Sequence, residues 1–324
     1  VEIWDADKQL QTHNFRATTT CPVGVGMHSL GAIACCSNRG VVNVWNPGQV
    51  AQLANEDSDT ESNQSDQEST KPACVFEIPT QQSSEILRMR MHRTEPVIGC
   101  GGRESVLKLF DIVSQKIAFR AKNVPHSYLK LRVPIFIRDL QFVHAGQAGS
   151  RRSGNSFELV TVSSHKHVRL YDTRAQRRPV RSVEFGEQSL RSVCITPDQK
   201  SLIVSDTTGR MTRLSMGEFK QISVFKGAGG SVRSIECHET LPLVASVGLD
   251  RCARVHNLNS RRILQRTYLR GRMNSVLFHG YPDPEGEEVA AFAELDTWAG
   301  ARVIDEHAVD SGEYLTRLPT CFFL

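Results

Sequence analysis

The sequence predicts an all-β protein, a β-propeller assembled from repeated four-stranded units. The first observation is a repeat: short β-rich segments end in a bulky residue followed by Asp, Asn or Ser. These segments are VEIWD, VVNVWN, VLKLFD, VRLYD, MTRLS and ARVHN. The second is the internal order of a unit, which at 190–227 contains four strand-like runs, LRSVCITPD, SLIVSDTTG, RMTRLSM and KQISVFKG. The third is that no long stretch has a 3.6-residue apolar period, so helices should be minor.

The spacing of the repeat indicates which propeller this is. From one bulky residue to the next the spacings are 41, 65, 61, 43 and 42 residues, and three of these five match the period of about 40–45 residues of WD40 blades. Tight turns are expected before the third strand of a unit, at 38–40, 206–209 and 249–251. We therefore expect a WD40 β-propeller over residues 1–279, with about five full blades plus partial blades.

The remainder of the chain departs from the repeat. The segment MNSVLFH at 273–279 is expected to be a first strand without its blade partners. Those partners would lie upstream of Val1, so we expect an N-terminally truncated chain. Residues 280–324 lose the pattern and are expected to form a poorly ordered C-terminal tail, with one short helix favoured near 287–298.

Two insertions account for the long spacings. Residues 55–70 (NEDSDTESNQSDQEST) hold six acids and no base, which is typical of a disordered loop. Residues 145–155 (AGQAGSRRSGN) are rich in Gly and Ser and predict a flexible loop. In the acidic loop, Ser58 and Ser65 are each followed by acids one and three positions later, the pattern of an acid-directed kinase, so both are candidate phosphorylation sites. An inert insertion is the alternative.

Composition and motifs give no sign of an enzyme, a metal site or a membrane span. The net charge is +4 and aromatic residues make up 7% of the chain, so neither argues nucleic-acid binding by itself. Nine cysteines without a CxxC pair favour reduced, buried thiols. The Cys/His pairs His165/His167 and Cys237/His238 are too isolated for zinc, so we expect no metal and no cofactor. The glycine-rich GVG and GAGG match no phosphate loop, and G-x-S-x-G and HExxH do not occur, so we expect no enzyme and no small-molecule substrate. No uncharged stretch reads as a membrane span, so no membrane partner is expected.

Several segments are more specific than a generic WD repeat. They are RAKNVPHSYLKLRVPIFIRDLQFV (120–143), YDTRAQRRPV (171–180), FKGAGGSVRSIECH (225–238), LVASVGLDRCARVH (243–256) and TYLRGRMNSVLF (267–278). Together they resemble the WD repeat-containing protein 74 family of pre-60S ribosome assembly factors. The extended 120–143 connection is the strongest signal, because WD proteins at large do not carry it.

The resemblance implies a seven-bladed, non-catalytic scaffold in the nucleus and nucleolus. Such a scaffold acts in large (60S) subunit biogenesis and rRNA processing, binds assembly factors on pre-60S particles, and is removed by an AAA-type ATPase. Direct contact with rRNA is left open. A rival from another class is a WD40 substrate receptor or scaffold of a ubiquitin-ligase or signalling complex, which the fold alone does not exclude.

The candidate site residues fall into two groups. Six residues in the 120–143 connection either pin that segment to the propeller or form a docking surface for a partner: Arg120, Lys122, Asn123, Lys130, Arg132 and Asp139. Two arginine clusters are either solvated charge on outer strands or phosphate contacts to rRNA: Arg174, Arg177, Arg178 and Arg181, and then Arg261, Arg262, Arg266, Arg270 and Arg272. Asp250 and Arg251 are expected to lie in a turn that the Asp250 side chain braces.

Overall fold

Every regular element in the described part of the chain is a β-strand. The computed structural model describes residues 2–5, 10–14, 22–27, 33–45, 74–79, 84–126, 128–143, 156–278 and 321–323. The chain divides into two compact units, Val1–Leu190 and Arg191–Leu324. The predicted loops at 55–70 and 145–155, with Ser58 and Ser65, and the helix favoured near 287–298 lie outside the described residues.

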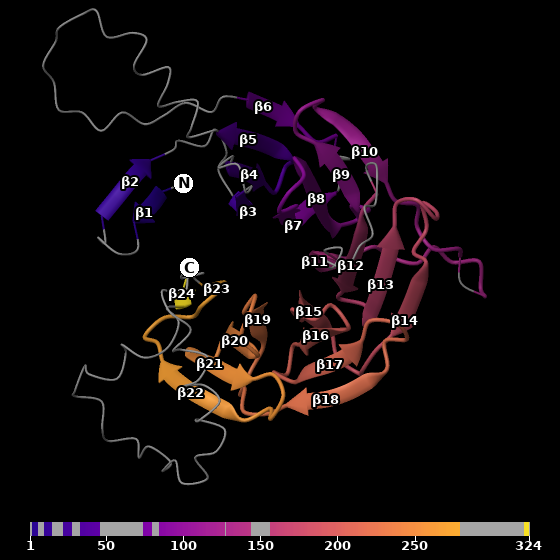
Figure 1. Ribbon diagram of the computed structural model, residues 1–324. Helices are drawn as coiled ribbons and strands as arrows, with labels where there is room; N and C mark the ends of the chain where they lie inside the picture. The colour runs from indigo at the N-terminus through magenta and orange to yellow at the C-terminus, as the bar shows by residue number, and fades with distance from the viewer. Residues whose placement is uncertain are drawn as a thin grey trace, which may run out of the picture. The chain divides into compact units, whose positions relative to one another are not determined.

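The first unit contains three four-stranded antiparallel sheets, and in each sheet the strand order follows the chain. Their strands are β3 (Pro22–Met27), β4 (Ile33–Ser37), β5 (Val41–Trp45) and β6 (Cys74–Glu77); β7 (Glu85–Met91), β8 (Val97–Arg103), β9 (Lys108–Asp111) and β10 (Lys116–Arg120); and β11 (Ile137–Val143), β12 (Glu158–Ser163), β13 (His167–Asp172) and β14 (Arg181–Glu184). A two-stranded hairpin, β1 (Glu2–Asp5) with β2 (Leu10–Asn14), precedes them. Figure 1 labels these elements.

The second unit contains two more sheets of the same order. Their strands are β15 (Leu190–Ile195), β16 (Ser201–Asp206), β17 (Met211–Ser215) and β18 (Gln221–Phe225), followed by β19 (Val232–Cys237), β20 (Leu243–Gly248), β21 (Cys252–Asn257) and β22 (Ile263–Tyr268). These five meanders among the described residues are the full blades that the repeat predicts, and the all-β fold of a WD40 propeller is confirmed.

The position of a strand within its blade determines its composition. Second strands are small, apolar and buried on both faces: every residue of β20 (LVASVG) is buried. Fourth strands are mostly exposed, as β10 and β14 show. Glycine on β8 lets neighbouring blades pack closely, because a Cβ at Gly101 would lie 2.9 Å from the Ile137 side chain of β11. The apolar core thus runs between blades, and one buried cluster joins Leu107 and Leu109 to Leu140 and Leu159.

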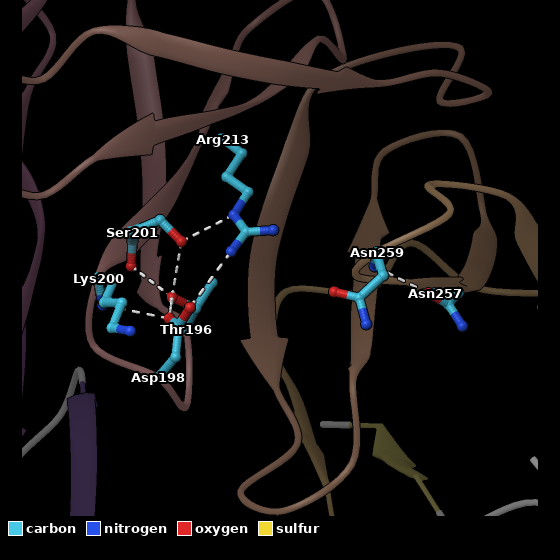
Figure 2. Close-up of polar contacts among 7 residues, drawn as sticks. All are labelled: Thr196, Asp198, Lys200, Ser201, Arg213, Asn257 and Asn259. Carbon is cyan, nitrogen blue, oxygen red and sulfur yellow. Dashed lines mark hydrogen bonds and ion pairs between the residues drawn. The ribbon is translucent and has the colours of Figure 1, made fainter. Parts of the chain in front are cut away.

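The Asp or Asn of the repeat closes the hairpin between the third and fourth strands. The carboxylate of Asp111 accepts a hydrogen bond from the Val113 amide at 3.0 Å, and Asp172 does the same for the Arg174 amide at 2.9 Å. Asn257 accepts from the Asn259 amide at 2.8 Å (Figure 2). The sequence signature therefore has a local cause, since a short side-chain acceptor two residues before the amide fixes the turn.

A polar cluster holds the first hairpin of the β15–β18 blade (Figure 2). The Thr196 hydroxyl lies 2.7 Å from the Ser201 carbonyl and also contacts the Asp198 carboxylate. Arg213 of β17 donates from Nε to the Ser201 hydroxyl at 2.7 Å and from Nη2 to Asp198 at 3.4 Å. The turn between the first two strands is thereby fixed to the third strand.

One expectation is wrong. The 273–279 segment has a partner, because β23 (Val276–Phe278) pairs antiparallel with β24 (Cys321–Phe323), which lies in the stretch expected to be a tail. The physical reason is that an open strand edge presents unpaired N–H and C=O groups that another β-prone apolar segment can satisfy. The predicted turns at 38–40, 206–209 and 249–251 are present. The limits 1–279 and 280–324 stay a prediction.

Candidate partner-binding surface

The fold brings two of the predicted groups together. The segment between β10 and β11 lies against the loop between β13 and β14, and Figure 1 shows the former as a magenta loop beside β13. The Lys122 amide donates to the Arg177 carbonyl at 2.7 Å, and the Arg177 Nε donates back to the Arg120 carbonyl at 2.9 Å. The Arg178 Nε donates to the Asn123 carbonyl at 3.3 Å. The 120–123 end of the connection and Arg177 and Arg178 of the first arginine cluster therefore form one surface.

We call this surface the basic surface and define it by its exposed cations. They are Arg120, Lys122, Lys130, Arg132, Arg174, Arg177 and Arg178. Arg177 and Arg178 use Nε for the backbone contacts above. Arg132 forms an ion pair with Glu104 at 2.9 Å, with the two side chains 60% and 36% exposed. A pair this exposed contributes little stability, so Arg132 can exchange Glu104 for a partner's carboxylate at small cost.

Asn123 fixes the base of the connecting loop. Its Nδ2 donates to the Val133 carbonyl at 2.7 Å, and its Oδ1 accepts from the Val124 amide at 2.9 Å. One side chain thus ties together two backbone positions nine residues apart in the sequence, Val124 and Val133. The Ala121 amide adds a hydrogen bond to the Leu107 carbonyl at 2.9 Å. Asn123 acts here as a residue that positions the loop.

Asp139 lies apart from this surface. It is on β11 with 2% of its side chain exposed, and it accepts a hydrogen bond from the Arg88 Nε of β7 at 2.8 Å. The Arg90 Nε lies 3.9 Å away. These contacts join two neighbouring blades and give Asp139 a structural role, while its part in partner binding stays a prediction.

The tip of the connecting loop carries exposed apolar residues that the charge pattern of the sequence does not indicate. Tyr128 is 99% exposed, Leu129 70% and Leu131 63%. Lys130 between the leucines has a positive φ of 58°, which is a turn conformation. The string YLKL inside an otherwise basic segment is the sequence signal that could have identified them. We call Tyr128, Leu129 and Leu131 the apolar tip.

The remaining arginine cluster lies on the second unit. All five of its residues, Arg261, Arg262, Arg266, Arg270 and Arg272, are exposed on or after the β21–β22 hairpin. Arg261 occupies the turn with a φ of 62°, and the Asn257 amide donates to the Arg262 carbonyl at 3.0 Å. Arg181, the last member of the first cluster, is exposed on β14.

The turn at 249–251 behaves as expected. The Asp250 carboxylate accepts from the Cys252 amide at 3.4 Å, from the Gly229 amide at 3.2 Å and from Arg254 at 2.5 Å. Burial alone would raise the pKa of Asp250, but the hydrogen bonds from Arg254 and the two amides lower it overall. The Asp250 side chain therefore stabilises the turn in which it lies.

The buried cysteines are held as unreactive thiols. Six described cysteines are free and buried, as expected for reduced thiols. Burial raises the pKa of Cys36, and that of Cys100 to about 12 although the Lys108 ammonium opposes the rise. Such thiols are weak nucleophiles. The described residues contain no group of three or more His, Cys, Asp or Glu arranged to hold a metal ion. In the same residues no helix is long and apolar enough to cross a membrane.

The repeated four-stranded sheets, their Asx-closed hairpins and an exposed basic surface define a WD-repeat β-propeller protein. No family model matches the chain. Human WD repeat-containing protein 74 is 33% identical over 282 residues, covering 84% of this chain and 66% of that protein, and the Bos taurus protein gives the same values. The ribosome biogenesis protein nsa1 of Schizosaccharomyces pombe is 25% identical over 236 residues, covering 63% of this chain and 60% of its own length. The chain belongs to the WD repeat-containing protein 74 family, and it spans slightly less than two thirds of the length of these first relatives.

Proposed function

We propose that this chain is a non-catalytic WD40 scaffold in large (60S) ribosomal subunit biogenesis and rRNA processing. It acts in the nucleus and nucleolus and binds assembly factors on pre-60S particles. The observation that carries the proposal is the relationship to proteins named for ribosome biogenesis, joined to an exposed basic surface on the 120–143 connection. An AAA-type ATPase removes the bound scaffold.

The mechanism is binding by a preformed surface. The backbone hydrogen bonds between the 120–123 segment and the 177–178 segment fix where the cations lie before a partner arrives. A preorganised surface loses less conformational entropy on binding. Guanidinium groups bind carboxylates and phosphates with two parallel hydrogen bonds, which adds geometric selection to charge. The five arginines of the second unit supply contacts to rRNA phosphates, which need only clustered charge.

Charge reversal of the basic surface tests the proposal. Arg120→Glu, Lys122→Glu and Arg132→Glu together should shift the protein from the pre-60S fractions of a sucrose gradient to the top of the gradient. The matched control reverses three exposed lysines outside the surface, Lys116, Lys200 and Lys226, and should sediment like the wild type.

Thermal melting must first show that both variants are folded. Full co-sedimentation of the folded triple variant would contradict the docking role of this surface. Recovery of cullin or kinase components instead of pre-60S factors with the wild-type chain would favour a ubiquitin-ligase or signalling scaffold.

A further inference from the structure

We propose that the apolar tip, Tyr128, Leu129 and Leu131, is the anchor that inserts into an apolar groove of a protein partner, and that the groove is rimmed by carboxylates. This inference rests on the proposed function, because it names the kind of partner that the basic surface binds. It differs from the sequence-based expectation, which assigned binding to the charged residues of the same segment.

The three tip residues are exposed to solvent. Three large apolar side chains with 99%, 70% and 63% of their surface in water lie within four consecutive positions. Single exposed apolar residues are common, whereas an exposed apolar cluster surrounded by polar residues marks an interaction site. Interface energy is concentrated in a few such anchors.

The base of the loop that carries the tip is held in place. Asn123 ties the two ends of the loop at 2.7 Å, and Arg178 ties Asn123 to the neighbouring loop. The Glu104 amide donates to the Ile135 carbonyl at 2.9 Å, which fixes the return of the chain towards β11. These ties lower the entropy cost of presenting the tip to a partner.

The segment around the tip is positively charged. Residues 120–134 contain four cations, Arg120, Lys122, Lys130 and Arg132, and no acid. Arg177 and Arg178 lie beside them through the hydrogen bonds described above. A groove that receives the tip must therefore have negative charge at its rim, because interfaces pair opposite potentials.

The same cations could face RNA, but the apolar side chains favour a protein. Single-stranded RNA is held by aromatic rings on which bases stack. Only one of the three tip residues is aromatic, and burying two leucines requires apolar surface that a phosphate backbone does not provide. A protein groove satisfies both the leucines and the cations.

The decisive experiment uses photo-crosslinking on purified pre-60S particles. The full chain with p-benzoylphenylalanine in place of Leu129 is incubated with particles and irradiated. We expect an adduct whose size ribonuclease leaves unchanged and whose digest contains a peptide of a second protein. The crosslinked peptide should contain apolar residues with Asp or Glu nearby.

Affinity for the same particles gives an independent readout. Leu129→Ala with Leu131→Ala, which leaves every charge in place, should weaken binding at least about tenfold. The matched control truncates two equally exposed apolar residues elsewhere, Ile222→Ala (56% exposed) and Tyr268→Ala (65% exposed), and should stay within about twofold of the wild type.

Each other outcome overturns the inference in a distinguishable way. An adduct that ribonuclease removes means that the tip binds RNA. Particle binding without any adduct, and with unchanged affinity of the double variant, means that the tip is free while the proposed function stands. Failure of the wild-type chain to bind particles removes the proposed function and the inference together.

Discussion

Replacing Asp139 by Ala should destabilise the first unit strongly. Asp139 is 2% exposed and accepts from Arg88, whose side chain is 21% exposed, at 2.8 Å. Removing one partner of a buried ion pair costs about 3–5 kcal/mol, because the other charge is left without compensation. Arg88 keeps some contact with water, so we expect the low end, about 3 kcal/mol. That corresponds to a change of about a hundredfold in the unfolding equilibrium.

Urea unfolding followed by intrinsic fluorescence measures this loss. The wild type, Asp139→Ala and the double variant Arg88→Leu/Asp139→Leu should be compared. The slope of the unfolding free energy against urea concentration should be the same for all three. The double variant should recover part of the loss, because it no longer leaves the Arg88 charge without its carboxylate. A loss below about 0.5 kcal/mol in Asp139→Ala would refute the view that this pair holds two blades together.

Two further predictions concern the second unit and the turns. Burial lowers the pKa of His256 below its ordinary 6.5, so the unfolded chain binds more protons than the folded one. The stability from His256 is therefore complete above about pH 6.5 and is lost as the pH falls through the lowered pKa. The unfolding free energies at pH 7.5 and pH 5.5 should differ less in His256→Gln than in the wild type. An equal difference in both proteins would contradict this. Gly209 has a φ of 100° and a Cβ there would lie 2.5 Å from a backbone carbonyl, whereas Gly186 has a φ of 74° and open space around it. Gly209→Ala should lower the melting temperature clearly more than Gly186→Ala, which adds only the left-handed strain of about 1–2 kcal/mol. A smaller drop for Gly209→Ala would show that the backbone carbonyl near Gly209 can move away.

The local features of the blades were readable from the chain. The Asp or Asn after the third strand acts within its own hairpin, as Asp111 and Asn257 show. Small apolar second strands such as β20 follow from burial on both faces. Both effects depend on residues close in sequence or on period, so the repeat predicted the sheets, their order and their turns.

Contacts between distant segments were not readable in this way. The sequence selected Asp139 and Arg132 alike as charges in one unusual segment, yet one is buried against Arg88 and the other is exposed beside Glu104. It selected the 120–132 and 174–178 residues as separate groups, and the backbone hydrogen bond from Lys122 to Arg177 makes them one surface. The charge of a residue is a local property of the chain, whereas its burial and its neighbouring side chains depend on which blades lie side by side.

The sequence by itself thus determined the class of fold, the repeat and the family resemblance. Only the tertiary structure decided that β23 pairs with β24 and that Asn123 clamps a loop. It also decided that Tyr128, Leu129 and Leu131 stand in water rather than in a core. The physical reason is that a hydrophobic residue type occurs both in cores and on surfaces. Whether a leucine is buried in the core or exposed as an anchor depends on how the rest of the chain packs around it.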